Sequence, residues 1–532
     1  MVKDRRGKWA ILWVVPLLLI LSAGRGRACT DIEGYNLSVC ADLFVNGYFR
    51  LTPIFGTVNR TLWSFQKQSF YTIHADNLEF QRNELALTVD GLPKAISDWL
   101  GFNVRYHIRI EPWYDSTYDF TGIGQGSFHR PLADQLSNNL NARYGEFWDP
   151  LFREYYFDLS PPHFSIRIGR QIVAWGKSDG FYILDIINNF NLVNPEIFNE
   201  QDVKIPNWMA NINWLATSSG TLQLLLIPVY IPTYYPGYQV AGGYPIQGGY
   251  GDFTYGVVKY FNNFYNGSFG FKVPVTKMPM PQPGKLDDWT YGLRWSDRYH
   301  AFHYTVNFLY TYTTTVIQYP NTGNFATATA ANFHPHRMYM GGGSADYEFN
   351  TGNPWFDGTV LRGESAVLNG DQFYEGIEGN PQGVTHWSTL VAMDRYILTD
   401  YLERPIFFSV QYYQDWVVAR NGTNPQPGPG ASEYEWYGFQ GGHSGLRASY
   451  YDSSTMYLYK TFMQGDILAA QFAAVYEWQF QDMWFQPSLS YRYNDKTTFV
   501  LGFNIFAGSR QTPYGEFTDN SNIYFELHKV IF

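Results

Sequence analysis

The residues with the greatest capacity for chemistry lie in one stretch of the sequence, between positions 169 and 185. Charged, amide and indole side chains are interspersed there with glycines. The six that could meet a ligand are Arg170, Gln171, Trp175, Lys177, Asp179 and Asp185. They could line a passage and gate or guide a solute. They could equally serve the fold, because Arg170 could brace either aspartate, the indole could pack, and glycines permit unusual backbone angles. The sequence leaves both interpretations open.

A second group of candidates follows a period of two. Between positions 102 and 111, large apolar residues alternate with polar ones, and the polar positions include Arg105, His107 and Arg109. Successive side chains of a strand point to opposite faces, so these three share a face. Arg492 holds a polar position in a similar run near the C-terminus. We interpret the four as the lining of a wet lumen rather than as a site for one specific ligand.

Motifs of catalysis are missing from the sequence. It contains no Gly-x-Ser-x-Gly, no His-Glu-x-x-His and no Walker loop. His443 is next to Ser444, but neighbours on a strand point to opposite faces. His334 and His336 offer two ligands, whereas zinc sites use three or four protein ligands. We therefore predict that the protein is not an enzyme, and that it holds no metal and no cofactor.

Composition narrows the class of protein. The chain has 532 residues, of which 19% are aromatic and only 16% charged, and it contains 49 glycines. The first 28 residues carry six basic side chains and one acidic one, so their removal takes the net charge from −10 to about −15. Nucleic-acid binding needs a basic surface, so nucleic acid is excluded as a partner. The mean hydropathy of −0.28 also argues against a helical membrane protein.

Residues 1–28 are predicted to be a cleaved signal peptide. Four basic residues precede an apolar run at 9–23, and small residues at 26 and 28 suit a cleavage site. The run falls short of the ~20 residues that a spanning helix needs. Cys29 would follow the cut. We expect it to pair with Cys40 in an oxidising compartment rather than to carry a lipid.

The alternation at 102–111 recurs at 302–312, 470–480 and 485–505, each time with apolar residues on one face. Segments of this kind, about 10 residues long, are typical of transmembrane barrels. We predict an all-β protein in the bacterial outer membrane, with residues 29–532 forming a single antiparallel β-barrel of about 14–18 strands. Outer-membrane lipid would surround it, and the C-terminal Phe532 would be read by the barrel-assembly machinery.

Long connections rich in glycine, proline and aromatic residues are expected at 232–251, 320–357, 362–384 and 421–445, and a shorter one at 507–520. We predict that they are extracellular, and that the short turn at 494–496 is periplasmic. Residues 181–199 lack a period of two and contain five asparagines. We expect the segment 176–208 to fold into the lumen as a plug or constriction.

Strict alternation from Phe164 would turn Arg170 toward lipid, which is costly. Two arrangements would avoid this cost. The strand could contain a bulge at Gly169, or it could end near the membrane interface.

Several short motifs resemble one known family. They are the Gly-Arg-Gln…Trp-Gly-Lys-x-Asp-Gly run at 169–180, Asp-Ile-Ile-Asn at 185–188, Lys-Ile-Pro at 204–206, Ile-Pro-Val-Tyr-Ile-Pro at 227–232, and the C-terminal stretches 501–508 and 517–532. Together they are similar to the Gram-negative outer-membrane barrels catalogued as domain of unknown function thirteen-oh-two. Asn189 stands where the family has a proline. The resemblance implies a partnership with an RND-type exporter and the movement of lipids, sterols or hydrocarbons.

Three functions fit the sequence. The favoured one is a channel for hydrophobic or amphiphilic compounds that works with an inner-membrane RND-type exporter or a periplasmic carrier. The second is a general diffusion porin with a polar lumen, which the arginines support. The third is a structural barrel that sheathes a partner such as a cytochrome.

Overall fold

The computed structural model describes the chain at residues 30–32, 37–50, 59–64, 69–74, 78–111, 113–115, 152–190, 204–231, 233, 281–313, 317–320, 331–353, 356–374, 381–397, 404–421, 450–463, 466–508, 514 and 521–531. The predicted signal peptide, Cys29, most of the predicted loops at 232–251 and 421–445, and Phe532 lie outside these residues.

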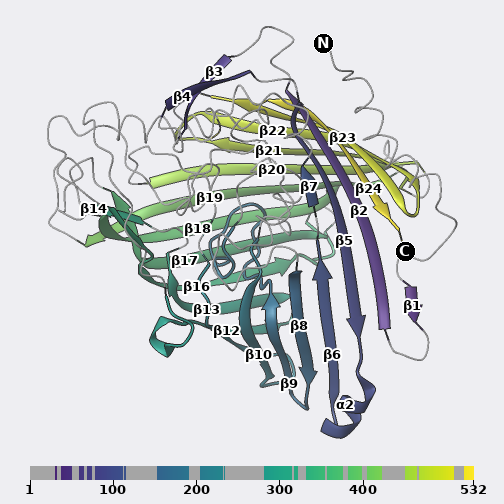
Figure 1. The fold of residues 1–532 in the computed structure, drawn as a ribbon, viewed down its shortest axis with the longest axis vertical. Coiled ribbons are helices and arrows are strands. Elements are labelled where there is room, and N and C mark those ends of the chain that lie inside the picture. The colour runs from purple at the N-terminus through teal and green to yellow at the C-terminus, as the bar shows by residue number, and fades with distance from the viewer. Residues whose placement is uncertain are drawn as a thin grey trace.

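The described strands form a closed antiparallel barrel of 18 strands (Figure 1), at the upper end of the predicted range. Closure comes from β24, the last strand, which pairs with β2 from Asp42↔Val530 to Arg50↔Asn522. The barrel strands are β2 (Leu37–Arg50), β5 (Leu78–Gly91), β6 (Asn103–Ile110), β8 (Phe152–Ser160), β9 (Phe164–Gln171), β10 (Asn207–Leu215), β11 (Thr221–Ile227), β12 (Thr290–Tyr299), β13 (Phe302–Tyr312), β16 (Arg337–Glu348), β17 (Thr359–Tyr374), β18 (Pro381–Ile397), β19 (Ile406–Asn421), β20 (Tyr450–Phe462), β21 (Leu468–Glu477), β22 (Asp482–Asn494), β23 (Thr497–Ala507) and β24 (Asn522–Val530).

Smaller elements decorate the ring. Two short strands pair with barrel strands, β1 (Thr30–Ile32) with β2 and β7 (Trp113–Asp115) with β5. Two hairpins stand apart, β3–β4 (Asn59–Ser64, Ser69–His74) and β14–β15 (Ile317–Pro320, Ala331–His334). Among the described residues, the helices are α2 (Lys94–Leu100) and the 3-10 turn η4 (Leu286–Asp288). None of the described helices is long and apolar enough to cross a membrane.

The two ends of the barrel differ. At one end β24 finishes and short connections such as 161–163, 216–220, 300–301 and 495–496 join the strands; we call this the turn end. The opposite end is the loop end, where longer connections such as 228–289 leave the strands. This asymmetry is usual for outer-membrane barrels, whose short turns are periplasmic.

Alternating residues explain why these segments form a membrane barrel. On β13 the outward Val306 and Phe308 are 59% and 48% exposed, whereas the inward Thr305 and Asn307 are buried. At these positions of β13 the outer face is apolar and the inner face polar. Because closure satisfies every strand edge, the architecture suits a lipid environment.

Two of the predicted loops are wrong in their positions. The stretch 320–357 contains all of β16, and the stretch 362–384 belongs to β17 and β18 apart from residues 375–380. Glycines misled the sequence interpretation there, above all Gly341–Gly343. Pairing with β13 on one side and β17 on the other keeps this glycine run in the sheet.

The last strand, β24, keeps the alternation over most of its length. Its outward side chains include Phe525 and Leu527, while Glu526 and His528 point inward. The alternation breaks at the turn end, where Lys529 has the outward register and Val530 the inward one.

Candidate functional site

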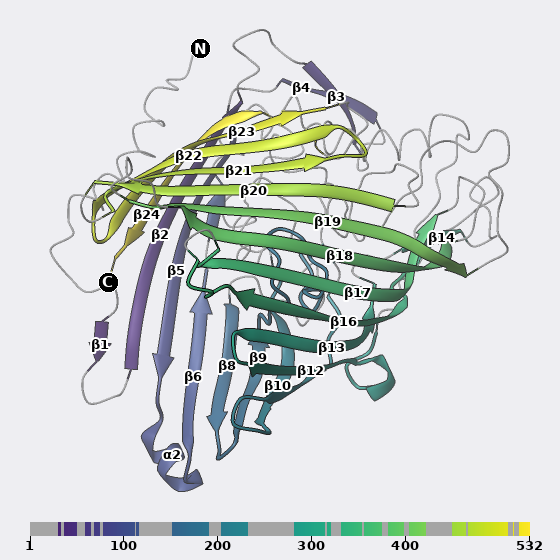
Figure 2. The same ribbon diagram turned by 180° about the vertical axis from the view of Figure 1, so that it is seen from behind.

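The chain leaves β9 at Gln171 and enters the lumen. Residues 172–190, which we call the inward segment, lie inside the ring of strands (Figure 1, Figure 2). Its apolar side chains join one buried cluster with lumen-facing residues from β10 to β20. From the segment come Val173, Trp175, Phe181, Ile183, Leu184, Ile186 and Ile187, and from the wall come Met209, Leu225, Ile227, Leu309, Met338, Met340, Ala366, Leu368, Leu390, Ala392, Tyr413 and Tyr451. The lumen therefore contains an apolar core along one side.

Aromatic contacts fix two points of this core. The Phe181 ring stacks on Tyr413 of β19, with ring centroids 4.7 Å apart. Trp175 is 2% exposed, and its indole Nε1 donates a hydrogen bond of 2.8 Å to Gln223 on β11. Both aromatic side chains are thus held by packing and not displayed to the remaining lumen.

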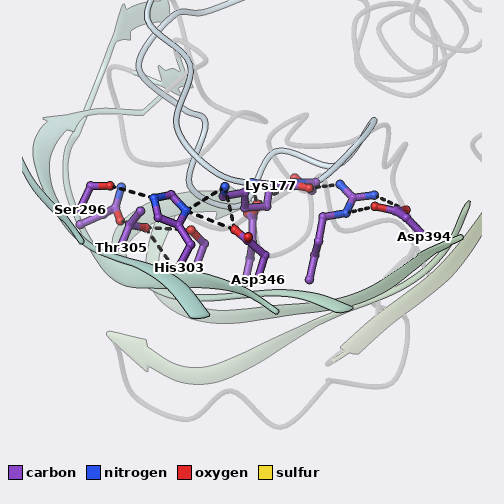
Figure 3. Close-up of polar contacts among 11 residues, drawn as sticks. Lys177, Ser296, His303, Thr305, Asp346 and Asp394 are labelled. Carbon is purple, nitrogen blue, oxygen red and sulfur yellow. Dashed lines mark hydrogen bonds and ion pairs between the residues drawn. The ribbon is translucent and has the colours of Figure 1, made fainter. Parts of the chain in front are cut away.

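A charged cluster joins the tip of the segment to the wall (Figure 3). The Lys177 ammonium lies 2.7 Å from the Asp346 carboxylate of β16 and 3.2 Å from Nδ1 of His303 on β13. Nδ1 of His303 is in turn 3.3 Å from Asp346. All three side chains are partly exposed, at 24–32%, so the contribution of the ion pair to stability is modest.

Arg362 of β17 makes the second part of this cluster. Its guanidinium pairs with Asp394 of β18 at 2.6 Å and with Asp179 of the segment at 2.7 Å, and it also donates to the Lys177 carbonyl. Planar guanidinium donors suit several acceptors held at fixed angles. Gln411 completes the contact, since it accepts from the Asp179 amide at 3.0 Å.

Glu364 of β17 binds the backbone at the tip of the inward segment. Its Oε1 accepts hydrogen bonds from the backbone amides of Lys177 and of Ser178, the latter at 2.7 Å. Gly176 approaches it so closely that an added Cβ would meet Oε1 at 2.7 Å, and its φ of +95° also favours glycine. We call Lys177, Asp179, Asp346, Arg362 and Glu364 the latch.

The base of the segment has its own polar network. Asp185 accepts from the Lys204 ammonium and from the Trp175 amide. Asn188, which is fully buried, accepts from the Val173 amide at 2.8 Å and donates to the Ile205 carbonyl at 2.9 Å. These contacts close the segment on itself and give it one defined conformation.

A tyrosine outside the strands anchors the same region to the wall. The Tyr230 hydroxyl donates to the Thr313 carbonyl at 2.7 Å, and Asn189 donates to the carbonyl of Ile231 at 2.6 Å. Burial raises the pKa of Tyr230 well above its usual range. The phenol therefore stays protonated and keeps its donor role.

Replacing Glu364 tests how the latch holds the segment. In E364A the amides of Lys177 and Ser178 lose a buried acceptor, whereas E364Q keeps an oxygen at the same position. Orphaned buried groups cost ~1–3 kcal/mol each. We expect hydrogen exchange in a peptide spanning 172–190 to be at least ~10-fold faster in E364A. The same peptide in E364Q should exchange nearly as slowly as in the parent. Equal exchange in all three proteins would show that Glu364 does not restrain the segment.

Two predicted lining residues do not line the lumen. Arg170 lies opposite Tyr155 and Trp208 in the ladder, so its register is outward, yet it is fully buried. It donates to the carbonyls of Phe152 at 2.8 Å and of Pro206 at 3.2 Å. The pairing of β9 shows no shift at this point, so the strand end and not a bulge removes the conflict with lipid.

Gln171 is likewise structural. Its side chain is fully buried and donates to the Met209 carbonyl at 3.1 Å. The predicted boundaries of the inward segment also change, because it leaves the wall at 172, before 176, and because Asn207 and Trp208 already belong to β10. Residues 191–203 lie outside the described part.

The predicted residues on β6 form a separate lumenal group near the turn end. His107 lies 2.7 Å from Asp90 and stacks on Tyr156, with centroids 4.7 Å apart. Arg167 covers the same tyrosine at 3.9 Å and pairs with Asp158 at 2.7 Å.

The other two arginines of β6 face the same lumen. Arg109 pairs with Glu111, and Arg105 is exposed opposite Asp158 in the ladder. None of the β6 residues shares a described contact with the latch. The structure therefore does not bring the sequence-predicted candidates together in one site.

Arg492 is exposed near the turn end of β22 and belongs to neither group. Cys40 is disulfide-bonded, and the one other cysteine of the chain is Cys29, outside the described residues. Among the described residues, no group of three or more histidine, cysteine, aspartate or glutamate side chains could hold a metal ion.

The sequence interpretation missed the wall side of the latch. Its wall residues Asp346, Arg362 and Glu364 fall within the stretches 320–357 and 362–384, which were predicted to be loops. One signal in the sequence could have indicated a strand here. Arg362, Glu364, Ala366 and Leu368 follow one another at every second position, as residues on one face of a strand do, and Leu361 and Gly363 lie on the other face.

Comparison with known proteins gives one family and several distant structures. The family model described as "Protein of unknown function (DUF1302)" matches residues 66–381. No curated protein matches the chain.

Three solved structures with a similar barrel are distant from this chain in sequence. Acinetobacter baumannii OccAB3 has a TM-score of 0.42 at 6% identity, over 92% of this chain and 98% of that one. A BenF-like porin from Pseudomonas fluorescens Pf-5 has 0.41 at 9% identity, over 94% and 99%. Pseudomonas aeruginosa OccK5 (OpdH) has 0.40 at 7% identity, over 92% and 97%.

Proposed function

This chain belongs to the family described as "Protein of unknown function (DUF1302)", and we propose that it is an outer-membrane channel. Its substrates are hydrophobic or amphiphilic compounds of the lipid, sterol or hydrocarbon class. The inward segment is its constriction, and the latch holds the constriction shut. An inner-membrane RND-type exporter or a periplasmic carrier is its partner.

The observation that carries this proposal is the apolar wall under the inward segment. Met338, Met340, Leu368 and Leu390 face the lumen and are buried beneath the segment. A porin with a water-filled lumen has a polar inner face. If the segment moves, the surface it uncovers is apolar and could bind the chain or ring system of an amphiphile.

A second candidate, a general diffusion porin, is favoured by a charged group on β5, β8 and β9. Asp90, Asp158 and Arg167 keep 53%, 30% and 35% of their side-chain surface exposed, on strands outside the β10–β20 part of the wall that forms the apolar core. Charged side chains that alternate in sign suit the passage of small polar solutes through water.

Quenching of Trp175 separates the two candidates. The emission of the protein minus that of W175F isolates this indole from the other 16 tryptophans. A channel for amphiphiles should let a brominated long-chain fatty acid quench this difference emission, because bromine would reach the apolar core. In the same preparation, proteoliposomes should not swell in isotonic sugar. Swelling without quenching would replace the first candidate with the porin.

Export and assembly are proposed with the channel. The segment 1–28 would direct the chain across the inner membrane, and Phe532 would engage the assembly machinery. The turn end would then face the periplasm, where the exporter or carrier would dock.

A further inference from the structure

The helix α2 lies at the turn end, in the connection from β5 to β6 and past the tip of β5 (Figure 1, Figure 2). The pairing of β5 with β6 stops at Gly91↔Tyr106, so Val104 of β6 has no strand partner on that side. Ser97 of the helix fills the gap. Its hydroxyl accepts from the Val104 amide at 3.0 Å and donates to the Val104 carbonyl at 3.5 Å. These contacts fix which side of the helix meets the barrel.

The other sides of α2 differ in polarity. Ile96, Trp99 and Leu100 are spaced i, i+3 and i+4, which places them on one face. They are 47%, 83% and 37% exposed. Lys94 and Asp98 lie on the opposite face and are exposed too. The helix is therefore amphipathic, and all three apolar side chains of this face remain exposed.

The burial of Val104 shows where the apolar face points. Val104 has the outward register of β6, since Arg105 and His107 point inward, yet it is only 3% exposed. Outward residues on the neighbouring strands remain open, with Phe157 at 54% and Phe164 at 42%. The helix α2 lies next to Val104, because Ser97 bonds both of its backbone groups, and we infer that the helix covers Val104 on the lipid side. The charged face then points toward the barrel axis and the solvent at the turn end.

The apolar face is continuous with the aromatic band of the barrel. Phe157, Phe164 and Trp214 are outward and exposed near the turn ends of β8, β9 and β10. Phe164 and Trp214 stack with centroids 6.5 Å apart. Aromatic belts of this kind lie at the headgroup level of a bilayer.

From these observations we propose that α2 is an interfacial anchor. Ile96, Trp99 and Leu100 enter the headgroup region of the leaflet at the turn end, and the ligand of this surface is phospholipid. A short amphipathic helix binds weakly alone, but here the barrel already holds it at the interface. The proposal requires only that the barrel spans a membrane, and it holds for a diffusion porin as well as for an amphiphile channel.

Site-directed fluorescence tests the anchor in the full chain. A single cysteine is introduced as W99C or, on the opposite face, as D98C, and is labelled with an environment-sensitive nitrobenzoxadiazole probe. The labelled proteins are reconstituted in vesicles of phosphatidylcholine and phosphatidylglycerol. Retarded migration on heating in gels confirms that both barrels are folded.

The two positions should differ strongly. We expect iodide quenching at position 99 to be at least ~3-fold weaker than at position 98, and shallow nitroxide-labelled lipids to quench position 99 preferentially. Equal iodide quenching at both positions would overturn the anchor. Protection at position 99 without lipid quenching would also overturn it, and would indicate a protein contact instead.

Discussion

Replacing residues 173–203 by a short glycine–serine linker is expected to turn a nearly silent barrel into a conducting one. Asn207 and Gln171 are partners in the β9–β10 ladder, so the chain ends meet and about six residues are enough to join them. Barrels of 16–18 strands leave an aqueous channel once nothing fills them. In planar bilayers, we expect single-channel conductance to rise by about tenfold or more over the parent.

The matched control is an equivalent replacement of residues 422–449, which connect β19 to β20 at the same loop end. This connection has a similar length, and it lies outside the described residues. Conductance of this control should stay near the parent value. A large, steady conductance of the parent itself would refute the constriction and favour a diffusion porin. So would a replacement of 173–203 that changes nothing.

The barrel could be predicted because lipid and lumen impose opposite requirements on neighbouring residues. On β13 the alternation of Phe308 with Asn307 carries this requirement in the sequence itself. The inward segment could be located for the complementary reason. Residues 181–199 follow neither a lipid-facing nor a lumen-facing pattern, and their described part, 181–190, lies inside the barrel.

The latch could not be predicted, because its partners are far apart in the sequence. Lys177 and Glu364 are 187 positions apart. Their contact depends on where β17 lies in the ring and on the register of every strand between. A shift of one residue in β17 would turn Glu364 toward lipid. Spacing within the segment therefore identified Lys177 and Asp179 but not the residues they meet.

Arg170 shows a different limit of sequence reasoning. The sequence shows that Arg170 is charged and that strict alternation would give it an outward, lipid-facing position, and these two properties conflict. The sequence could state that either a bulge or a strand end must resolve the conflict. It could not choose, since the choice depends on two carbonyls at the ends of other strands, those of Phe152 and Pro206.

The second large effect concerns this buried guanidinium. R170M removes the donors while keeping a side chain of similar length, so the two carbonyls lose their partner inside the protein. Each orphaned buried group costs ~1–3 kcal/mol. We expect the free energy of unfolding to fall by about 3 kcal/mol or more, measured from urea unfolding of the detergent-solubilised barrel. The free energy of unfolding of R170K should lie between those of the parent and R170M, because an ammonium cannot reproduce the planar fork of guanidinium donors.

The control R167M separates a structural role from a role in the lumen. Arg167 is the nearest arginine on the same strand, but it points inward, is 35% exposed and pairs with Asp158. A partly exposed pair contributes ~1 kcal/mol or less, so R167M should leave unfolding almost unchanged and act on ion selectivity. If Arg170 lined a passage, the pattern would reverse, with R170M altering selectivity and leaving stability intact. The orientation of a single side chain thus distinguishes two roles that the sequence motif alone treats as equal.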